Sequence, residues 1–185
     1  LNITASNVIL NGDGYQINGT VFVTGASNVS VRNLKIDPAY GLIVNNTNDS
    51  VFENISIINS TIYGIWITNN SNRNNITNVS INATNGYGIK IDNGQNNTID
   101  CLGSRISGPL LNDSYGIFTD QTRTSIKNCI ISNFDTGIFN SGGTRAIYNN
   151  LTILGSLYEG IYLNTPASNS TISNIVINSS EYYST

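Results

Sequence analysis

Short runs in which apolar and polar residues alternate recur along the whole chain. One recurring phrase places a glycine before two apolar residues that are separated by a single position, as in the run YGIWIT at residues 63–68. Alternation with a period of two and many β-branched residues predicts strands rather than helices. The phrase occurs six times, at Gly41, Gly64, Gly88, Gly116, Gly137 and Gly160, with spacings of 23, 24, 28, 21 and 23 residues. A period of this length is typical of solenoids.

A second phrase, with an asparagine in its third position, repeats in step with the first. It occupies residues 31–36, 52–57, 76–81, 126–131, 148–153 and 172–177, and residues 99–102 fill the missing position imperfectly. Two short strands per period, with Ile and Val in place of fixed Leu positions, favour a parallel β-helix over a leucine-rich repeat. We therefore predict an all-β fold, a parallel β-helix of about 7–8 coils with 21–28 residues per coil.

The repeats indicate one domain. It spans residues 1–185, with a first coil at 1–27, a loop insertion at 104–114 and a terminal tail at 178–185. Because neither end shows a polar or helical cap, we expect the ends to continue into removed sequence or to stack on another subunit. A chain that starts at Leu1 and contains no Met is expected to be processed or excised.

Apolar side chains should stack inside the coils from both strands. After the glycines come Leu42, Ile65, Ile89, Ile117, Ile138 and Ile161, then Val44, Ile67, Ile91 and Leu163, with Thr119 and Asn140 as polar interruptions. The second strand contributes Leu34, Ile55, Val79, Cys129, Leu151 and Ile175, then Ile36, Ile57, Ile81, Ile131, Ile153 and Ile177. The asparagines at 33, 54, 78, 128, 150 and 174 are expected to form an internal ladder of amide hydrogen bonds.

Composition excludes several kinds of chemistry. The chain is 39% hydrophobic and 10% charged with a net charge of −3, so it offers no basic stripe for nucleic acid. No apolar run approaches the roughly 18 residues of a membrane span. The chain has no His, which removes Ser-His-Asp and Cys-His catalysis, and its 2 Cys are too few for a zinc site. We expect no cofactor and no metal, no nucleic-acid partner and no membrane span in this segment.

Asparagine is unusually frequent and often begins a glycosylation sequon. Of 32 Asn, 16 begin Asn-x-Ser/Thr, where random placement would give roughly 7. Three of them, Asn54, Asn78 and Asn150, belong to the expected internal ladder and should be inaccessible. The remaining surface candidates are Asn2, Asn18, Asn28, Asn45, Asn48, Asn59, Asn69, Asn75, Asn82, Asn96, Asn112, Asn169 and Asn178. Covalent N-glycans on these residues would imply an extracellular protein at the cell surface.

The residues two positions after each glycine should point outward and form a row on one face. They are Ile43, Trp66, Lys90, Phe118, Phe139 and Tyr162. An exposed aromatic row can stack on sugar rings, be covered by another subunit or lie beneath a loop of its own chain, and packing against protein is the preferred interpretation. The tyrosines at 40, 63, 87 and 115 are expected to form a structural stack.

Two pairs of residues on adjacent coils are further candidates. Asp92 and Asp120 each lie four residues after a glycine and should be close neighbours, as the two carboxylates of a glycosidase are. Polar residues leaving a strand would give the same pattern, and this simpler explanation is preferred. Cys101 and Cys129 fall at nearly equivalent positions, so they either form a disulfide or remain buried thiols.

The paired runs SNVSVRNLKI…YGLIVNN and NNITNVSI…YGIKIDN, with the opening run SNVILNGDGYQING, resemble a known repeat. They are similar to the right-handed parallel β-helix repeats of NosD-type and related carbohydrate-binding or sugar-hydrolase domains. Similar repeats occur in archaeal surface proteins. The resemblance implies the right-handed fold, whereas for activity it leaves lyases, hydrolases, epimerases, adhesins and structural proteins open.

Taken together, these observations favour a non-enzymatic extracellular structural protein. We expect a glycosylated β-helical subunit of a cell-surface layer, sheath or filament that self-associates end to end or laterally. The alternative is a polysaccharide-binding or polysaccharide-degrading domain, a hydrolase or lyase, that uses the flat outward row with Asp92 and Asp120.

Overall fold

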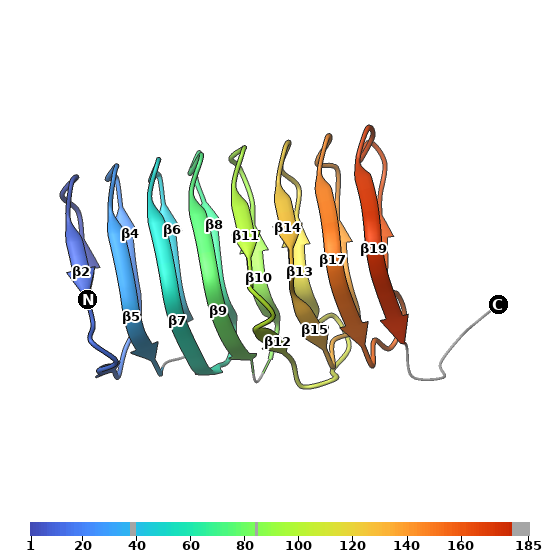
Figure 1. Ribbon diagram of the computed structural model, residues 1–185, viewed down its shortest axis with the longest axis horizontal. Helices are drawn as coiled ribbons and strands as arrows, with labels where there is room; N and C mark the ends of the chain where they lie inside the picture. The colour runs from blue at the N-terminus through green and yellow to red at the C-terminus, as the bar shows by residue number, and fades with distance from the viewer. Residues whose placement is uncertain (38–39, 84, 179–185) are drawn as a thin grey trace.

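The computed structural model describes residues 1–37, 40–83 and 85–178, and in this part of the chain every regular element is a strand. One sheet has eight strands, one from each coil, which confirms a solenoid of about eight coils (Figure 1). In spatial order its strands are β1 (Asn2–Ile3), β4 (Val21–Thr24), β6 (Tyr40–Asn45), β8 (Tyr63–Thr68), β10 (Tyr87–Ile91), β13 (Tyr115–Thr119), β16 (Thr136–Asn140) and β18 (Ile161–Leu163). The described residues contain no helix that is long and apolar enough to cross a membrane.

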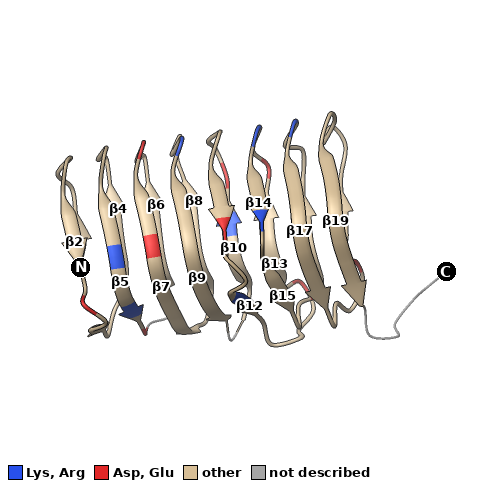
Figure 2. Cartoon of the chain, in the orientation of Figure 1, with Lys and Arg blue, Asp and Glu red and all other residues tan. Residues whose placement is uncertain are grey.

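The second sheet has eleven strands and lies on the opposite side of the coils. It contains β2 (Ile9–Asn11), β3 (Gln16–Ile17), β5 (Ser30–Ile36), β7 (Val51–Ser60), β9 (Asn75–Ala83), β11 (Thr98–Asp100), β12 (Arg105–Ser107), β14 (Ser125–Lys127), β15 (Ile130–Ser132), β17 (Ile147–Leu154) and β19 (Thr171–Asn178). Every pairing between strands is parallel, as in β5 with β7 and β17 with β19. Both sheets carry few charges, which gather at the turns and on a few strands (Figure 2).

The predicted ladders fill the space between the sheets. Leu42 pairs with Ile65, and the same register continues coil by coil to Ile161. These side chains are buried except Ile161, which is half-buried. In the last described coil Ile177 is 49% exposed, since the described residues place no further coil on that side. A Cβ on Gly64 would lie 2.5 Å from the carbonyl oxygen of Gly88, so this position requires glycine.

The asparagine ladder exists, but its predicted internal position is wrong. Its six residues have φ between +51° and +56°, in the left-handed region that Asn tolerates. This conformation turns the side chains to the outer surface, where Asn54 donates to Asn33 Oδ1 at 2.8 Å and Asn150 donates to Asn128 Oδ1 at 2.8 Å. The sequons at Asn54 and Asn150 are exposed and that at Asn78 is half-buried, so these three are not inaccessible.

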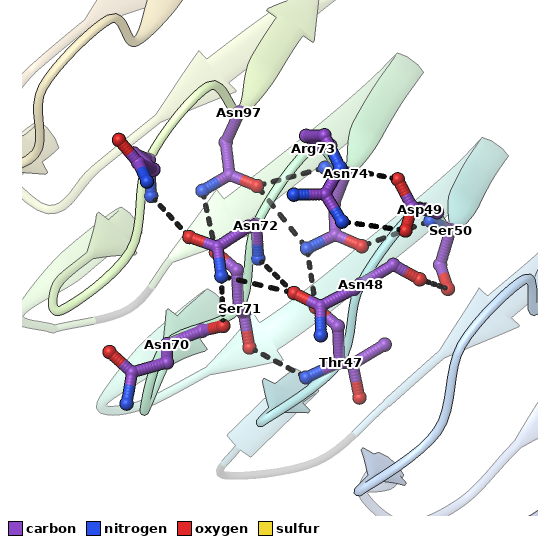
Figure 3. A network of polar contacts seen from close by, with 11 residues as sticks. Thr47, Asn48, Asp49, Ser50, Asn70, Ser71, Asn72, Arg73, Asn74 and Asn97 are labelled. Atoms are coloured by element: carbon purple, nitrogen blue, oxygen red, sulfur yellow. Dashed lines mark hydrogen bonds and ion pairs between the residues drawn. The ribbon is translucent and has the colours of Figure 1, made fainter.

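A buried polar network lies instead in the turns that precede the eleven-stranded sheet (Figure 3). Asn74 donates to the carbonyl oxygen of Thr47 at 2.8 Å, and Asn97 donates to that of Ser71 at 2.9 Å and to Gln121 Oε1 at 2.9 Å. These side chains therefore satisfy backbone groups that the turn would otherwise bury without partners.

The two polar interruptions of the core ladder bond to nearby backbone, and Asn140 also bonds to a side-chain hydroxyl. Asn140 donates to the carbonyl oxygen of Gly143 and to the hydroxyl of Tyr148, both buried. Thr119 Oγ1 accepts the N–H of Gln121 at 3.1 Å. Each therefore closes a turn at the end of its strand.

The predicted insertion at 104–114 is only partly a loop. Residues Arg105–Ser107 form β12, which pairs with β9 and β15, so the bulge begins after this strand. Cys101 and Cys129 are joined by a disulfide just before it. The predicted tail at 178–185 lies outside the described residues except for Asn178, the last residue of β19.

Candidate functional site

The outward row lies along the middle of the eight-stranded sheet. Its members are in register from coil to coil, and Phe22 extends the row at its start. Phe118 lies 5.5 Å from Phe139 between ring centroids, and Phe139 lies 5.2 Å from Tyr162. Ile43 has the predicted place in the row, but only 8% of its surface is exposed, so it offers little to a ligand or a subunit. Its neighbours in register are the larger side chains of Phe22 and Trp66.

The tyrosines at the start of the same strands form a second row beside the first. Tyr63 lies 5.4 Å from Tyr87, and Tyr87 lies 5.2 Å from Tyr115 between ring centroids. The rows interlock, since Tyr63 is 4.9 Å from Trp66 and Tyr115 is 5.4 Å from Phe139. We call the combined surface the aromatic face, consisting of Tyr40, Tyr63, Trp66, Tyr87, Lys90, Tyr115, Phe118, Phe139 and Tyr162.

Sequence reasoning treated the two rows separately because they have different positions in the phrase. Strict alternation would put Tyr63 and Trp66, which are three residues apart, on opposite faces of the strand. The glycine that follows the tyrosine breaks this alternation, because Gly64 and Ile65 are both buried, and so the two rows share one face. Most of the rings are half-buried by one another, and each keeps part of its surface in contact with solvent. The result is a broad apolar strip along the solenoid.

Lys90 places one cation at the centre of the aromatic face. Its Nζ lies 5.5 Å from the Trp66 ring centroid and 5.7 Å from that of Phe118, which is within the range of cation–π attraction. It also forms an ion pair of 3.0 Å with Asp92 Oδ2, while Asp92 Oδ1 accepts the indole N–H of Trp66 at 3.2 Å. Partial burial alone would lower the pKa of Lys90, but the hydrogen bond to Asp92 and its charge raise it, so the ammonium is stabilised.

Asp120 lies one coil further on, at the end of β13. Its Oδ1 accepts the backbone N–H of Asn93 at 3.3 Å. Partial desolvation by neighbouring atoms raises the pKa of its carboxyl, whereas the hydrogen bond from the N–H of Asn93 lowers this pKa. The negative charge of Asp92 raises it further. The two carboxylates of the predicted pair interact electrostatically and lie in different environments, one ion-paired and one partly desolvated.

The face offers stacking surface, one fixed cation and two carboxylates to a ligand. Neighbouring rings are stacked with an offset, as Phe118 is with Phe139 at 22° and Phe139 with Tyr162 at 21°, so each ring offers its edge and part of its face to a ligand. Such a surface, with a few polar groups beside it, suits a ligand whose own faces are apolar and whose rims carry hydroxyl groups. Among the described residues, no group of three or more His, Cys, Asp or Glu is placed to hold a metal ion.

The predicted sequons mostly lie at turns and strand ends, away from the centre of the aromatic face. Exposed members are Asn2, Asn18, Asn28, Asn59, Asn69, Asn75, Asn82, Asn112, Asn169 and Asn178, and half-buried ones are Asn45, Asn48 and Asn96. Asn69 donates to Asn45 Oδ1 at 2.9 Å, so these two neighbouring amides interact with each other.

Comparison with known proteins agrees with this architecture. The family model described as a right-handed β-helix region matches residues 2–108 and 64–184, which together span nearly the whole chain. The chain belongs to the right-handed β-helix family. A search of curated proteins gave no match.

A solved structure of similar shape is known. This β-helix is similar to the crystal structure of an alginate lyase from Paenibacillus sp. str. FPU-7, with a TM-score of 0.66 and 15% sequence identity. The match covers 88% of this chain and 75% of the lyase chain. At this identity the likeness establishes the fold, and the β-helix scaffold itself hosts many activities.

Proposed function

We propose that this β-helix binds an extended polysaccharide along the aromatic face of its eight-stranded sheet. The observation that carries the proposal is the continuous, partly exposed strip of interlocked rings, in register over successive coils, with the Lys90–Asp92 ion pair at its centre. Successive coils are roughly 4.8 Å apart, so rings recur along the strip with a spacing close to the length of one sugar unit. The fold that it shares with an alginate lyase also supports a carbohydrate ligand.

Binding can be followed through Trp66, the only Trp of the chain. A panel of soluble polysaccharides, including alginate, mannan and a β-glucan, is titrated while indole fluorescence is recorded. Removing an aromatic anchor should weaken binding strongly, so we expect Phe118→Ala to raise the dissociation constant of the bound polysaccharide about tenfold, or about 1.4 kcal/mol. Tyr15→Ala removes a ring that is 77% exposed outside the face and is the matched control. Equal affinities of the Phe118→Ala and Tyr15→Ala variants would contradict the proposal.

Degradation of the bound chain is a separate question, which the carboxylate pair raises. A raised pKa on Asp120 beside the ion-paired Asp92 resembles the arrangement of an acid and a second carboxylate in glycosidases. The proposal is binding without turnover, so a reducing-sugar assay should show no product. Turnover that disappears in the Asp120→Asn variant would assign a polysaccharide-degrading enzyme instead, a hydrolase or a lyase.

A second candidate is a glycosylated structural subunit of an extracellular surface layer, sheath or filament. The exposure of most sequon asparagines supports it. N-glycans at turns and strand ends would leave the aromatic face open for lateral self-association. In this case intact mass spectrometry of the native protein should show hexose additions, and electron microscopy should show an ordered lattice or fibre. A monomeric protein without added mass would exclude this candidate and leave polysaccharide binding untouched.

A further inference from the structure

Two shallow hollows lie on the other side of the molecule, in line with the left-handed asparagines at which the strands of the eleven-stranded sheet bend. One of about 530 Å³ is lined by Asn33, Asn54 and Ser56, and one of about 380 Å³ is lined by Asn128, Asn150 and Thr152. We call this line of hollows and bends the bend groove. It lies on the sheet opposite the aromatic face.

The walls of the bend groove are built from equivalent residues on successive coils. In the first hollow Lys35 pairs in register with Ser56, and Ser56 pairs with Ser80 on the next coil. In the second hollow Ile130 pairs with Thr152. The same strand position therefore forms one wall over most of the solenoid, which makes the two hollows parts of one repeated feature.

The floor of the bend groove presents amides in two runs, Asn33, Asn54 and Asn78 in one and Asn128 and Asn150 in the other, and the coil between the runs carries no asparagine at this bend. Asn54 donates to Asn33 at 2.8 Å, Asn78 donates to Asn54 at 3.4 Å, and Ser104 donates to Asn78 at 2.8 Å. Each amide nitrogen carries two N–H groups, and the ladder uses one of them. The second N–H of each amide recurs at the coil spacing of roughly 4.8 Å and is available to a ligand.

Charge in and beside the groove alternates in sign. The residues that line the first hollow include one acidic and one basic side chain, Asp13 and Lys35, and those that line the second include no charged residue. Beside the hollows, Arg32 on β5 pairs in register with Glu53 on β7, and Lys127 forms an ion pair of 3.3 Å with Asp100 (Figure 2). Opposite charges on adjacent coils cancel at a distance, so the groove lacks the single-sign field that attracts a polyanion. A ligand that complements it is neutral, extended and rich in hydroxyl groups.

We propose that the bend groove is a second binding site, for a single chain of a neutral polysaccharide. Hydroxyl groups on the polysaccharide would accept from the free amide N–H groups and exchange hydrogen bonds with Ser56, Ser80 and Thr152. With a site on each sheet, one molecule bridges two polysaccharide chains. This site is built from different residues than the aromatic face, so its test is independent of the proposed function.

The test uses the full chain with cellohexaose and mannohexaose as neutral probes and an alginate hexasaccharide as the acidic comparison. Binding is measured by calorimetry in a Trp66→Ala/Phe118→Ala background, in which the aromatic face is disabled. Ser56→Trp and Thr152→Trp fill the two hollows. Val51→Trp is the control, since Val51 is an exposed residue of the same sheet that lines neither hollow.

We expect a neutral hexasaccharide to bind in the disabled background and the Ser56→Trp/Thr152→Trp variant to bind it at least tenfold more weakly, while Val51→Trp binds it unchanged. Stronger binding of the alginate hexasaccharide than of both neutral probes would overturn the neutral ligand class. Equal binding by the groove-filled and control variants, or no neutral binding at all, would overturn the site. If the Trp66→Ala/Phe118→Ala variant, with both hollows unchanged, bound none of the probes, the bend groove would be overturned and the aromatic face would remain as the binding site.

Discussion

At the scale of single residues, the turns give many sequon hydroxyls a structural role. Thr47 and Ser71, which complete the sequons of Asn45 and Asn69, are fully buried. Thr47 Oγ1 donates to the carbonyl oxygen of Val23 at 3.1 Å, and Ser71 Oγ accepts the N–H of Thr47 at 3.1 Å. An Asn in the left-handed conformation allows a tight turn, and the buried hydroxyl that follows it provides hydrogen bonds for the backbone groups of that turn. Part of the excess of sequons therefore arises from the fold itself.

Asp135 shows how a buried carboxyl makes stability depend on pH. It is 7% exposed, and its Oδ1 is buried without a hydrogen-bond partner. Burial raises the pKa of this carboxyl, and the charges of Asp113 and Glu159 add to the effect. Because the pKa of Asp135 is raised in the folded state, its protonated carboxyl contributes to the free energy of unfolding. This contribution is complete below the unfolded pKa of about 3.8 and is lost as the pH rises through the folded pKa.

We expect Asp135→Asn to raise the free energy of unfolding at pH 7 by about 1 kcal/mol, or about 2–4 °C in Tm, because it removes the buried charge and keeps an acceptor for Asp113 N–H. The gain should shrink below pH 4, where the wild-type carboxyl is protonated. Asp49→Asn is a control of opposite sign, since the hydrogen bond and charge of Arg73 hold the pKa of Asp49 below its usual value. Thermal unfolding from pH 3 to 7 checks both, and a gain that is independent of pH would refute the explanation.

At the scale of the strand, the glycine phrase explains how the two sheets approach each other. A Cβ on Gly88 would lie 2.6 Å from the carbonyl oxygen of Gly116 and 2.5 Å from Ile106 Cγ2. The first contact is with backbone, which cannot move aside as a flexible side chain can. Glycine at this position therefore sets the distance between neighbouring coils and the opposite sheet.

Replacing this glycine by alanine should strain the coil more than removing a core methyl does. We expect Gly88→Ala to lower the free energy of unfolding by roughly 3 kcal/mol, at the upper end of overpacking costs. The neighbouring Ile89→Val variant should lose only about 0.5–1.5 kcal/mol. Urea unfolding of both variants measures the difference, and the two losses being equal would mean that the glycine is not required by packing.

At the scale of the whole molecule, the sequence predicts the core ladder because residues one period apart in the sequence pair in register on adjacent coils. The ladder from Leu42 to Ile161 follows directly from the spacing of the glycines. The place of the asparagine ladder could not be read in this way. Alternation from the inward Phe52 would put Asn54 inside, but φ of +53° at Asn54 resets the alternation so that Ile55 points inward.

The functional surfaces depend on information that a single repeat does not contain. The aromatic face needs the contact between two rows with different positions in the phrase, and the bend groove needs the left-handed residues. The buried Asn74 and Asn97 lie in turns where other coils have Val29 or Ala146, so no repeated phrase marked them. Sequence periodicity therefore predicts the scaffold, while its surfaces follow from the three-dimensional positions of individual side chains.

A solenoid holds together through interfaces between neighbouring coils, so a covalent link across one interface affects the whole molecule. The Cys101–Cys129 disulfide joins two adjacent coils across a sequence separation of 28 residues, just before β12 and β15. Closing a loop of this length restricts the unfolded chain by about 3–4 kcal/mol. We expect the Cys101→Ala/Cys129→Ala variant to lose about this much stability, with Ile99→Ala as a control for a buried side chain lost from the same coil.

Because coils contact only their neighbours, the weakened interface should also broaden urea unfolding or split it into two steps, whereas Ile99→Ala should shift a single transition. An unchanged midpoint and a single sharp step in the cysteine variant would show that the disulfide does not couple the two halves of the solenoid.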